Sequence, residues 1–198
     1  MSSVKKRIQK INLRFLSVLA IFGVLVWFAE PGLPKTKSGW DYLPFLISGL
    51  ALVAVGEIVR IWATGHLEKN KSLTTSGPYA YIKNPMYAGT FIIMLGCNIL
   101  AINPYIYYIL AVELAAFLFQ YVPAKNRIEK TRLLEKFGQD YADYDKNVPD
   151  YIPRRLTPYE KRTLKPWQWS VFRGNQEIQV GIAVLIGTAL IVGRLWIS

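Results

Sequence analysis

Apolar residues gather in five runs along the chain, and polar stretches separate these runs. The runs cover approximately residues 12–29, 43–63, 86–102, 105–122 and 180–196. Each run is about 17–20 residues long, which is the length that a helix needs to cross the hydrocarbon core of a bilayer. The pattern predicts an all-α integral membrane bundle of about five transmembrane helices. We expect a single membrane domain over residues 1–198, with a connector at 154–178 and the final transmembrane helix at 179–198.

The polar stretch at residues 74–89 contains more turn-forming residues than a plain connection needs. Gly77 and the proline after it predict a turn, and Asn84 precedes a proline and is therefore biased away from α geometry. Pro85 suits the first turn of a helix that begins near Met86. The predicted helix N-terminus would present free N–H groups that suit a carboxylate or phosphate. A tight turn that returns the chain to the membrane is the simpler interpretation of the same residues.

A second polar stretch follows the fourth apolar run. In it, Leu133, Phe137, Tyr141 and Tyr144 stand at positions i, i+4, i+8 and i+11. This spacing places them on one face of a helix and predicts an amphipathic helix that lies on the membrane or caps the bundle. Its charges alternate in sign, unlike those of a polybasic lipid anchor. Pro149 marks the predicted end of the helix.

The distribution of positive charge predicts the orientation. The formal net charge is +11, with 24 Lys and Arg residues. If five helices cross the membrane, 21 of these residues fall on one side and three on the other. The positive-inside rule then places the N-terminus in the cytoplasm and the C-terminus outside. The loop at 74–89 and the amphipathic helix both lie on the cytoplasmic side, so the charge is explained without nucleic acid.

The composition excludes several kinds of site. Cys97 is the only cysteine and His66 the only histidine, so one chain has no disulfide, no Cys-based metal site and no pair of histidines for general-base catalysis. Glu57 and Arg60 lie within the second apolar run, three residues apart on one helix face, where they can pair. Charges inside a span usually face the bundle interior or a cavity. Alternatively, Arg60 extends to the membrane surface from the end of the span.

Two motif-like stretches stand on either side of the third and fourth apolar runs. The first reads GPY at residues 77–79 and KNPMYAG at 83–89, and the second reads EKTRLLEKFGQDYADY at 129–144. Together they resemble the motifs of the isoprenylcysteine carboxyl methyltransferase family and, more distantly, those of the phospholipid N-methyltransferases. The resemblance covers about residues 56–153, the expected methyltransferase core. It departs from the family at Asn84, where the family has His, and at Lys130, where the family has a second Glu.

The resemblance implies a membrane-embedded enzyme that uses S-adenosylmethionine to methylate the carboxylate of a lipid-like or prenylated substrate. It implies that the cofactor is bound by Tyr79, Lys83, Asn84, Pro85, Tyr87, Gly89 and Glu129. The helix N-terminus and Lys83 suit the carboxylate of the cofactor, Glu129 suits its ammonium or ribose, and a tyrosine can pack on the adenine. Arg60 and Arg127 are the candidate catalytic residues, because a guanidinium can hold the substrate carboxylate through two hydrogen bonds.

The sequence also allows two other functions. One is N-methylation of a phospholipid or small lipid amine, for which a general base would help because the amine must first lose a proton. The other is a non-catalytic membrane protein that keeps the fold, and the departures at Asn84 and Lys130 favour it. All three functions have membrane lipids as neighbours and none involves nucleic acid. Carboxyl and amine methylation differ in pH dependence, because only the amine reaction rises through the pKa of its acceptor.

Overall fold

The structure is a computed structural model of the chain. It describes residues 42–68, 71–102, 106–115, 122–175 and 177–195, together with residues 23, 26 and 27. The regular elements of this part of the chain are all helical. They are α2 (Leu43–Thr64), the 3-10 helix η2 (Gly77–Ala80), α3 (Pro85–Leu100), α4 (Ile106–Ala115), α5 (Val122–Asn147), α6 (Trp169–Gly174) and α7 (Glu177–Leu195). The all-α fold class is therefore confirmed for the described residues.

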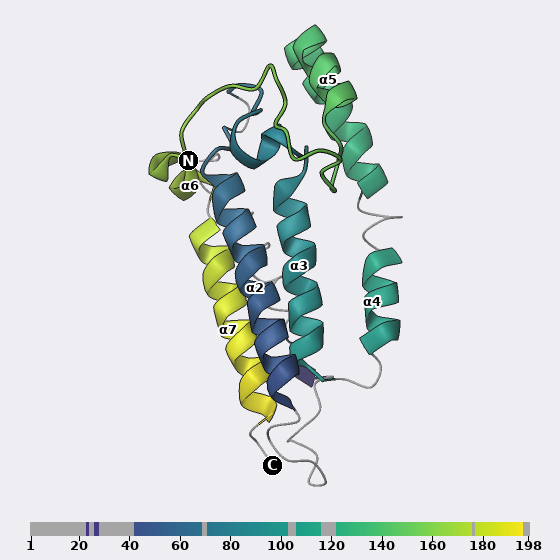
Figure 1. The fold of residues 1–198 in the computed structure, drawn as a ribbon, viewed down its shortest axis with the longest axis vertical. Coiled ribbons are helices and arrows are strands. Elements are labelled where there is room, and N and C mark those ends of the chain that lie inside the picture. The colour runs from purple at the N-terminus through teal and green to yellow at the C-terminus, as the bar shows by residue number, and fades with distance from the viewer. Residues whose placement is uncertain are drawn as a thin grey trace, which may run out of the picture.

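Helices α2, α3 and α7 form a bundle, and α4 lies to one side of α3 (Figure 1). The core of the bundle contains apolar side chains from all three helices: Val53 from α2, Ile93, Cys97 and Leu100 from α3, and Val184 and Ile191 from α7. The outer faces of the helices are also apolar, since Ile58 is 64% exposed and Leu185 is 69% exposed. Apolar side chains on both faces are typical of helices surrounded by lipid.

Within the described residues, two helices are long and apolar enough to cross a membrane. These are α2, with 22 residues, and α7, with 19 residues, and they correspond to the second and fifth apolar runs. Helix α3 is apolar but has only 16 residues, and α4 is described over 10 residues. The first run lies almost entirely outside the described residues. The structure thus supports membrane integration, whereas the count of five transmembrane helices stays a prediction.

Helices α2 and α3 approach each other closely near the predicted site. A Cβ atom at Gly56 would lie 2.6 Å from the carbonyl oxygen of Gly89, and one at Gly89 would lie 2.8 Å from the carbonyl oxygen of Gly56. Both distances are too short for a side chain, so this pair of glycines allows backbone contact, as small residues do between membrane helices. The contact fixes the N-terminal half of α3 against the C-terminal half of α2.

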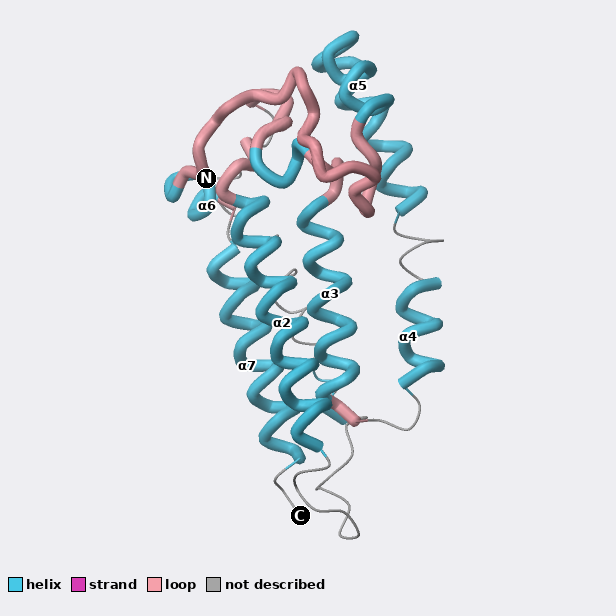
Figure 2. The backbone as a smooth tube through the Cα atoms, viewed as in Figure 1, coloured by secondary structure: helices cyan, strands magenta, loops and turns pink. Residues whose placement is uncertain are grey.

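The remaining elements gather at one end of the bundle. There α2 ends, α3 and α7 begin, and η2, α5, α6 and the loops between them form a cap (Figure 2). The segment between α5 and α6 is irregular and leads into the short helix α6, at Trp169–Gly174. Hydrogen bonds join the end of α6 to the end of α2 and the residues after it: Asn175 donates to the carbonyl oxygens of Thr64 and Leu67 at 2.9 Å each. The cap carries the residues of both motif-like stretches.

Candidate active site

The first motif-like stretch folds as the sequence predicts. Asn84 precedes α3 with φ −126° and ψ 54°, outside the α region, and Pro85 occupies the first turn of the helix. The side chain of Asn84 makes no capping hydrogen bond. Pro85 has no N–H, and the N–H groups of Tyr87 and Ala88 donate to the backbone carbonyl oxygen of Asn84 at 3.1 and 3.2 Å. What this end of α3 offers an anionic group is therefore mainly the positive end of the helix dipole. Tyr87 follows in the first turn and is partly buried.

The second motif-like stretch is bent, which the helical spacing does not predict. Helix α5 contains one non-helical residue, Gly138, with φ 51° and ψ −126°. This backbone conformation is open to glycine and costly for other residues. The bend allows the ammonium of Lys130 to form an ion pair with Asp145, 15 residues further along the same helix. In a straight helix the two residues would lie about 22 Å apart along the axis, so the two arms of α5 fold back toward each other.

The bend also explains the apolar face of α5. Leu133 and Phe137 from the first arm pack against a buried cluster that includes Tyr141 and Tyr144 from the second arm. Leu73 and Tyr159, from the loops of the cap, pack against the same cluster. The four residues do come together in one apolar cluster, but they reach it from the two arms of a bent helix and not from one face of a straight helix. The cluster packs inside the cap, which agrees with the capping alternative.

The two motif-like stretches contact each other directly. The hydroxyl of Tyr144 donates to the carbonyl oxygen of Tyr79 at 2.7 Å, and both side chains are buried. The backbone N–H groups of Lys83 and Asn84 donate to the carbonyl oxygens of Pro149 at 2.8 Å and residue 150 at 3.0 Å. We call these contacts between residues 79–84 and residues 144–150 the clasp.

Ion pairs strengthen the clasp. The ammonium of Lys83 lies 2.7 Å from Asp145 and 3.0 Å from Asp150, and Lys130 reaches the other oxygen of Asp145. Partial burial opposes ionisation of Asp145, but the hydrogen bonds from Lys130 and Lys83 outweigh it and lower the pKa of this carboxyl. Asp145 thus joins α5 to the loop before α3. This arrangement gives Lys130 a structural role at the position where the family has Glu.

Burial and nearby charges raise the pKa values of two tyrosine hydroxyls in the cap, those of Tyr79 and Tyr141. Burial is the main cause that raises the pKa of the Tyr79 hydroxyl, and the charges of Tyr87 and Glu129 add to the rise. Burial also raises the pKa of Tyr141 to about 12, with smaller contributions from Asp145 and then Glu129. Glu129 is partly exposed, and its carboxylate lies 3.9 Å from Arg132. Glu129 is thus among the charged groups that act on the Tyr79 hydroxyl, and its role in binding a cofactor stays a prediction.

Arg60 forms a buried ion pair that links three helices. Its guanidinium lies 2.5 Å from the carboxylate of Glu177, at the start of α7, and both side chains are at most 10% exposed. It also donates to the hydroxyl of Thr90 and, at 3.5 Å, to the carbonyl oxygen of Met86 on α3. The ion pair of Arg60 is thus with Glu177, whereas the sequence suggested Glu57. One carboxylate oxygen of Glu57 is buried without a hydrogen-bond partner among the described residues.

The other candidate residues lie as follows. Lys83 is ion-paired within the clasp, and Gly89 faces α2, where a Cβ would meet Arg60 at 2.7 Å. Arg127 lies in the first arm of α5, and its side chain is outside the described part of the structure. Sequence reasoning missed Asp145 and Glu177, the partners of two of the candidates. A signal existed only for Asp145, which directly follows the second motif-like stretch, next to Tyr144.

The sequence has relatives among known proteins. The sequence model of the phospholipid methyltransferase family matches residues 45–140. Protein-S-isoprenylcysteine O-methyltransferase B of Arabidopsis thaliana is 30% identical over 150 residues, which cover 70% of this chain and 70% of the plant protein. The chain belongs to the isoprenylcysteine O-methyltransferase family. The human Protein-S-isoprenylcysteine O-methyltransferase is 29% identical over 119 residues, or 54% of this chain, and the matched region spans only 40% of the human protein.

One further relative, from Cupriavidus metallidurans, is not named as a methyltransferase. The cobalt-zinc-cadmium resistance protein CzcN of Cupriavidus metallidurans is 29% identical over 142 residues, which cover 69% of this chain and 63% of that protein. Within the described residues, no group of three or more His, Cys, Asp or Glu side chains is placed to hold a metal ion. No solved structure matches the chain significantly. The matched regions of the human, plant and bacterial relatives all cover more than half of this chain.

Proposed function

We propose that the protein is a membrane-embedded methyltransferase that uses S-adenosylmethionine to methylate the carboxylate of an amphiphilic substrate of the isoprenylcysteine type. The clasp is the observation that carries this proposal. It holds Tyr79, the N-terminus of α3 and the two arms of α5 at one end of the bundle. Membership of the isoprenylcysteine O-methyltransferase family supports the same reaction.

The residues around the clasp suit the chemical groups of the cofactor. S-adenosylmethionine, when bound, supplies a methyl group on a positively charged sulfonium. The positive end of the α3 dipole favours its carboxylate. Glu129, whose charge acts on the Tyr79 hydroxyl, suits the ammonium or the ribose hydroxyls, and the ring of Tyr87 can pack on the adenine. Lys83 is already ion-paired with Asp145 and Asp150, so its role in this proposal is to hold the loop in place.

The absence of a pair of histidines in the sequence agrees with a carboxylate acceptor. A carboxylate is ionised at pH 7 and needs no general base. The protein then has to align acceptor and methyl donor and keep water out, which a site between a membrane bundle and a cap can do. Of the two candidate arginines, Arg60 is ion-paired with Glu177. We therefore assign the binding of the acceptor carboxylate to Arg127 and a positioning role to Arg60.

The proposal includes the orientation in the membrane. Five transmembrane helices place the N-terminus in the cytoplasm, the C-terminus outside and the site on the cytoplasmic face. The cap lies at the end of the bundle where α2 ends and α7 begins (Figure 1). The two long apolar helices support membrane integration. Cysteine accessibility from each side of the membrane, measured with single substitutions in the loops, tests this orientation.

N-methylation of a lipid amine is the alternative, and the match to the phospholipid methyltransferase family model favours it. The two reactions give products of different stability. A carboxyl methyl ester is cleaved by dilute base and releases methanol, whereas an N-methyl group survives. The rate of amine methylation should also rise steeply with pH up to the pKa of the amine, while that of carboxyl methylation should not.

The deciding experiment offers both acceptors to the purified protein. Methyl-labelled S-adenosylmethionine is supplied with either an N-acetylated S-farnesylcysteine or phosphatidylethanolamine in detergent micelles. We expect base-labile label on the farnesylcysteine, and about tenfold or greater loss of rate in Arg127→Ala if two charge-assisted hydrogen bonds are removed. Arg155→Ala, which changes an exposed arginine of the connector, is the control. Base-stable label on the phospholipid would replace this proposal by the amine reaction, and no label on either acceptor would favour a non-catalytic protein.

A further inference from the structure

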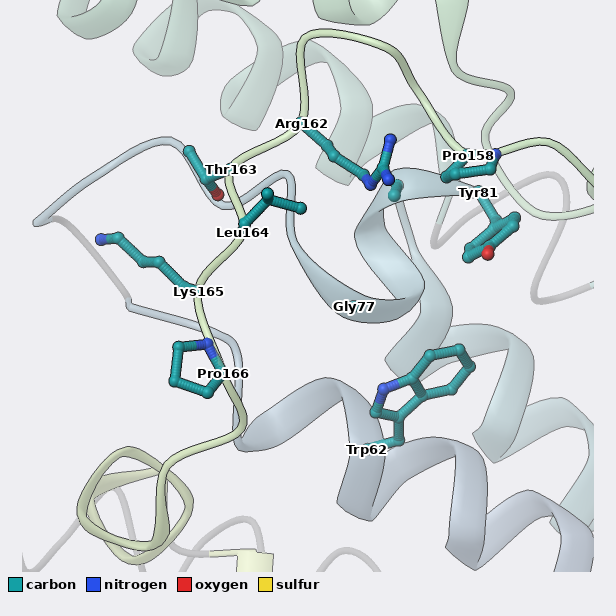
Figure 3. A pocket seen from close by; sticks show the side chains of 10 residues that line it. Trp62, Gly77, Tyr81, Pro158, Arg162, Thr163, Leu164, Lys165 and Pro166 are labelled. Atoms are coloured by element: carbon teal, nitrogen blue, oxygen red, sulfur yellow. The ribbon is translucent and has the colours of Figure 1, made fainter.

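A cavity lies in the cap, on the side of η2 that faces the connector. The cavity is shallow and open, with a volume of about 340 Å³. Its walls come from the last turns of α2, from η2 and its C-terminal neighbour, and from residues 158–166 of the connector (Figure 3). Cavities that bind small molecules usually have a volume of at least about 300 Å³. None of the candidate cofactor-binding residues lines this cavity.

The connector is held in place on both sides of the cavity. The N–H of Tyr159 donates to the carbonyl oxygen of Ala80 at 2.8 Å, and the N–H of Thr163 donates to the hydroxyl of Thr75 at 2.9 Å. Further on, the indole N–H of Trp167 donates to the carbonyl oxygen of Ile61 at 3.0 Å. The connector therefore forms a fixed arch, and the cavity is a built feature of the cap.

One cation in the cavity wall is available to a ligand. Lys165 is ion-paired with Glu68 at 2.6 Å, and Figure 3 shows its side chain pointing away from the cavity. Arg162 is only half-buried, and among the described residues its one hydrogen bond is to the carbonyl oxygen of Tyr159 at 3.3 Å. A guanidinium has five N–H donors, so most of them remain for a ligand. No acidic residue lines the cavity, and its charge therefore favours an anion.

The other walls are apolar and stand at the C-terminal end of α2, a helix long and apolar enough to cross a membrane. Trp62, in the last turns of the membrane-spanning helix α2, is 44% exposed, and its ring lies 6.5 Å from that of Tyr81. Leu164 is 84% exposed on the opposite wall. Tryptophan and tyrosine rings are typical of the level at which lipid headgroups meet the hydrocarbon core. An occupant that satisfies both the arginine and these walls has an anionic head and an apolar chain.

We propose that this cavity binds the headgroup of an anionic phospholipid, with the phosphate on Arg162 and the first part of the acyl chain along Trp62 and Leu164. The lipid would lie on the other side of η2 from Tyr79. It would therefore stabilise the wall that the two sites share. The proposal requires only that the protein lies in a membrane, and it does not depend on methyl transfer.

Native mass spectrometry of the full chain in detergent tests the proposal. The probes are phosphatidylglycerol and diacylglycerol with identical acyl chains, and only the first carries the phosphate that Arg162 is proposed to bind. We expect the wild-type protein to bind phosphatidylglycerol about tenfold more tightly, because a hydrogen bond to a charged group contributes at least that factor. Arg162→Ala should remove this preference, and Arg162→Lys should keep part of it. Arg155→Ala, at an exposed position of the connector outside the cavity, should leave it unchanged.

A second variant, Leu164→Asp, separates a loss of lipid binding from a loss of the folded structure. Leu164→Asp changes an exposed side chain, so the fold should survive, and it should abolish the preference for phosphatidylglycerol by charge repulsion. Equal binding of the two lipids by the wild type would overturn the proposal, and so would an Arg162→Ala variant that keeps the preference. Displacement of the lipid by an equal concentration of glycerol 3-phosphate would instead identify a site for soluble phosphates and refute the lipid assignment.

Discussion

Replacement of Gly138 by alanine should open the clasp. The Cβ atom would meet no other atom within 4 Å, so the substitution causes no steric clash with the rest of the protein. The cost arises from the backbone, because φ 51° with ψ −126° is a conformation that alanine adopts only with strain of about 1–3 kcal/mol. Straightening of α5 relieves the strain, but it pulls Lys130 away from Asp145 and the second arm away from η2.

Hydrogen exchange measures this opening directly. The N–H groups of Lys83 and Asn84 donate to residues 149 and 150 across the clasp, so their exchange reports how often it opens. A cost of about 1–3 kcal/mol corresponds to exchange about 5- to 150-fold faster in Gly138→Ala. Gly174→Ala in α6 is the matched control, since its Cβ also meets no atom within 4 Å and its φ is not positive. Equal exchange rates in the two variants would refute the argument that the bend needs glycine.

Three further predictions concern the contacts of the cap and the bundle. Tyr144→Phe removes a buried hydrogen bond and should destabilise the clasp by about 1–3 kcal/mol in hydrogen-exchange measurements, whereas Tyr108→Phe, at a position 74% exposed, should have no effect. Arg60→Ala leaves Glu177 buried without its partner and should cost about 3–5 kcal/mol in thermal unfolding, most of which the double variant with Glu177→Leu should recover; equal stabilities of the single and double variants would contradict this account. Ion pairs lower the pKa of folded Asp145 below the value of 3.8 in the unfolded chain. The clasp should therefore be fully protected from hydrogen exchange above about pH 5, and it should lose this protection as the pH falls through the lowered pKa. Asp145→Asn should remove this pH dependence.

Local features of the site could be predicted from the sequence because they depend on neighbouring residues. The proline after Asn84 sets the geometry before α3, and the spacing of Leu133, Phe137 and Tyr141 indicates which side chains of α5 pack together. The bend at Gly138 could not be predicted in this way. Glycine is tolerated inside a helix, and only the packing of both arms against the cap shows that the helix folds back.

Ion pairs between residues far apart in the chain could not be predicted from the sequence. Arg60 and Glu177 come from α2 and α7, and nothing in the pattern of either helix indicates that the two side chains meet. The nearby Glu57 was the natural partner by helical spacing, but the packing of α7 against α2 brings a second carboxylate to the same place. Lys83 was likewise predicted to bind the cofactor, whereas the structure pairs it with Asp145 and Asp150. The sequence did not show these partners, because they reach Lys83 only through the bend in α5.

Binding of S-adenosylmethionine to the detergent-purified protein tests the central claim most directly. We predict saturable binding in calorimetry, weakened about tenfold or more by Glu129→Ala or Tyr87→Ala, each of which removes a proposed contact. Glu135→Ala, an exposed glutamate on the same arm of α5, should bind like the wild type. Cys97 is 1% exposed and provides a check of folding, because it reacts with thiol reagents only when the bundle opens. Absence of binding by a wild-type protein whose Cys97 remains unreactive would contradict the assignment of the clasp as a methyltransferase site.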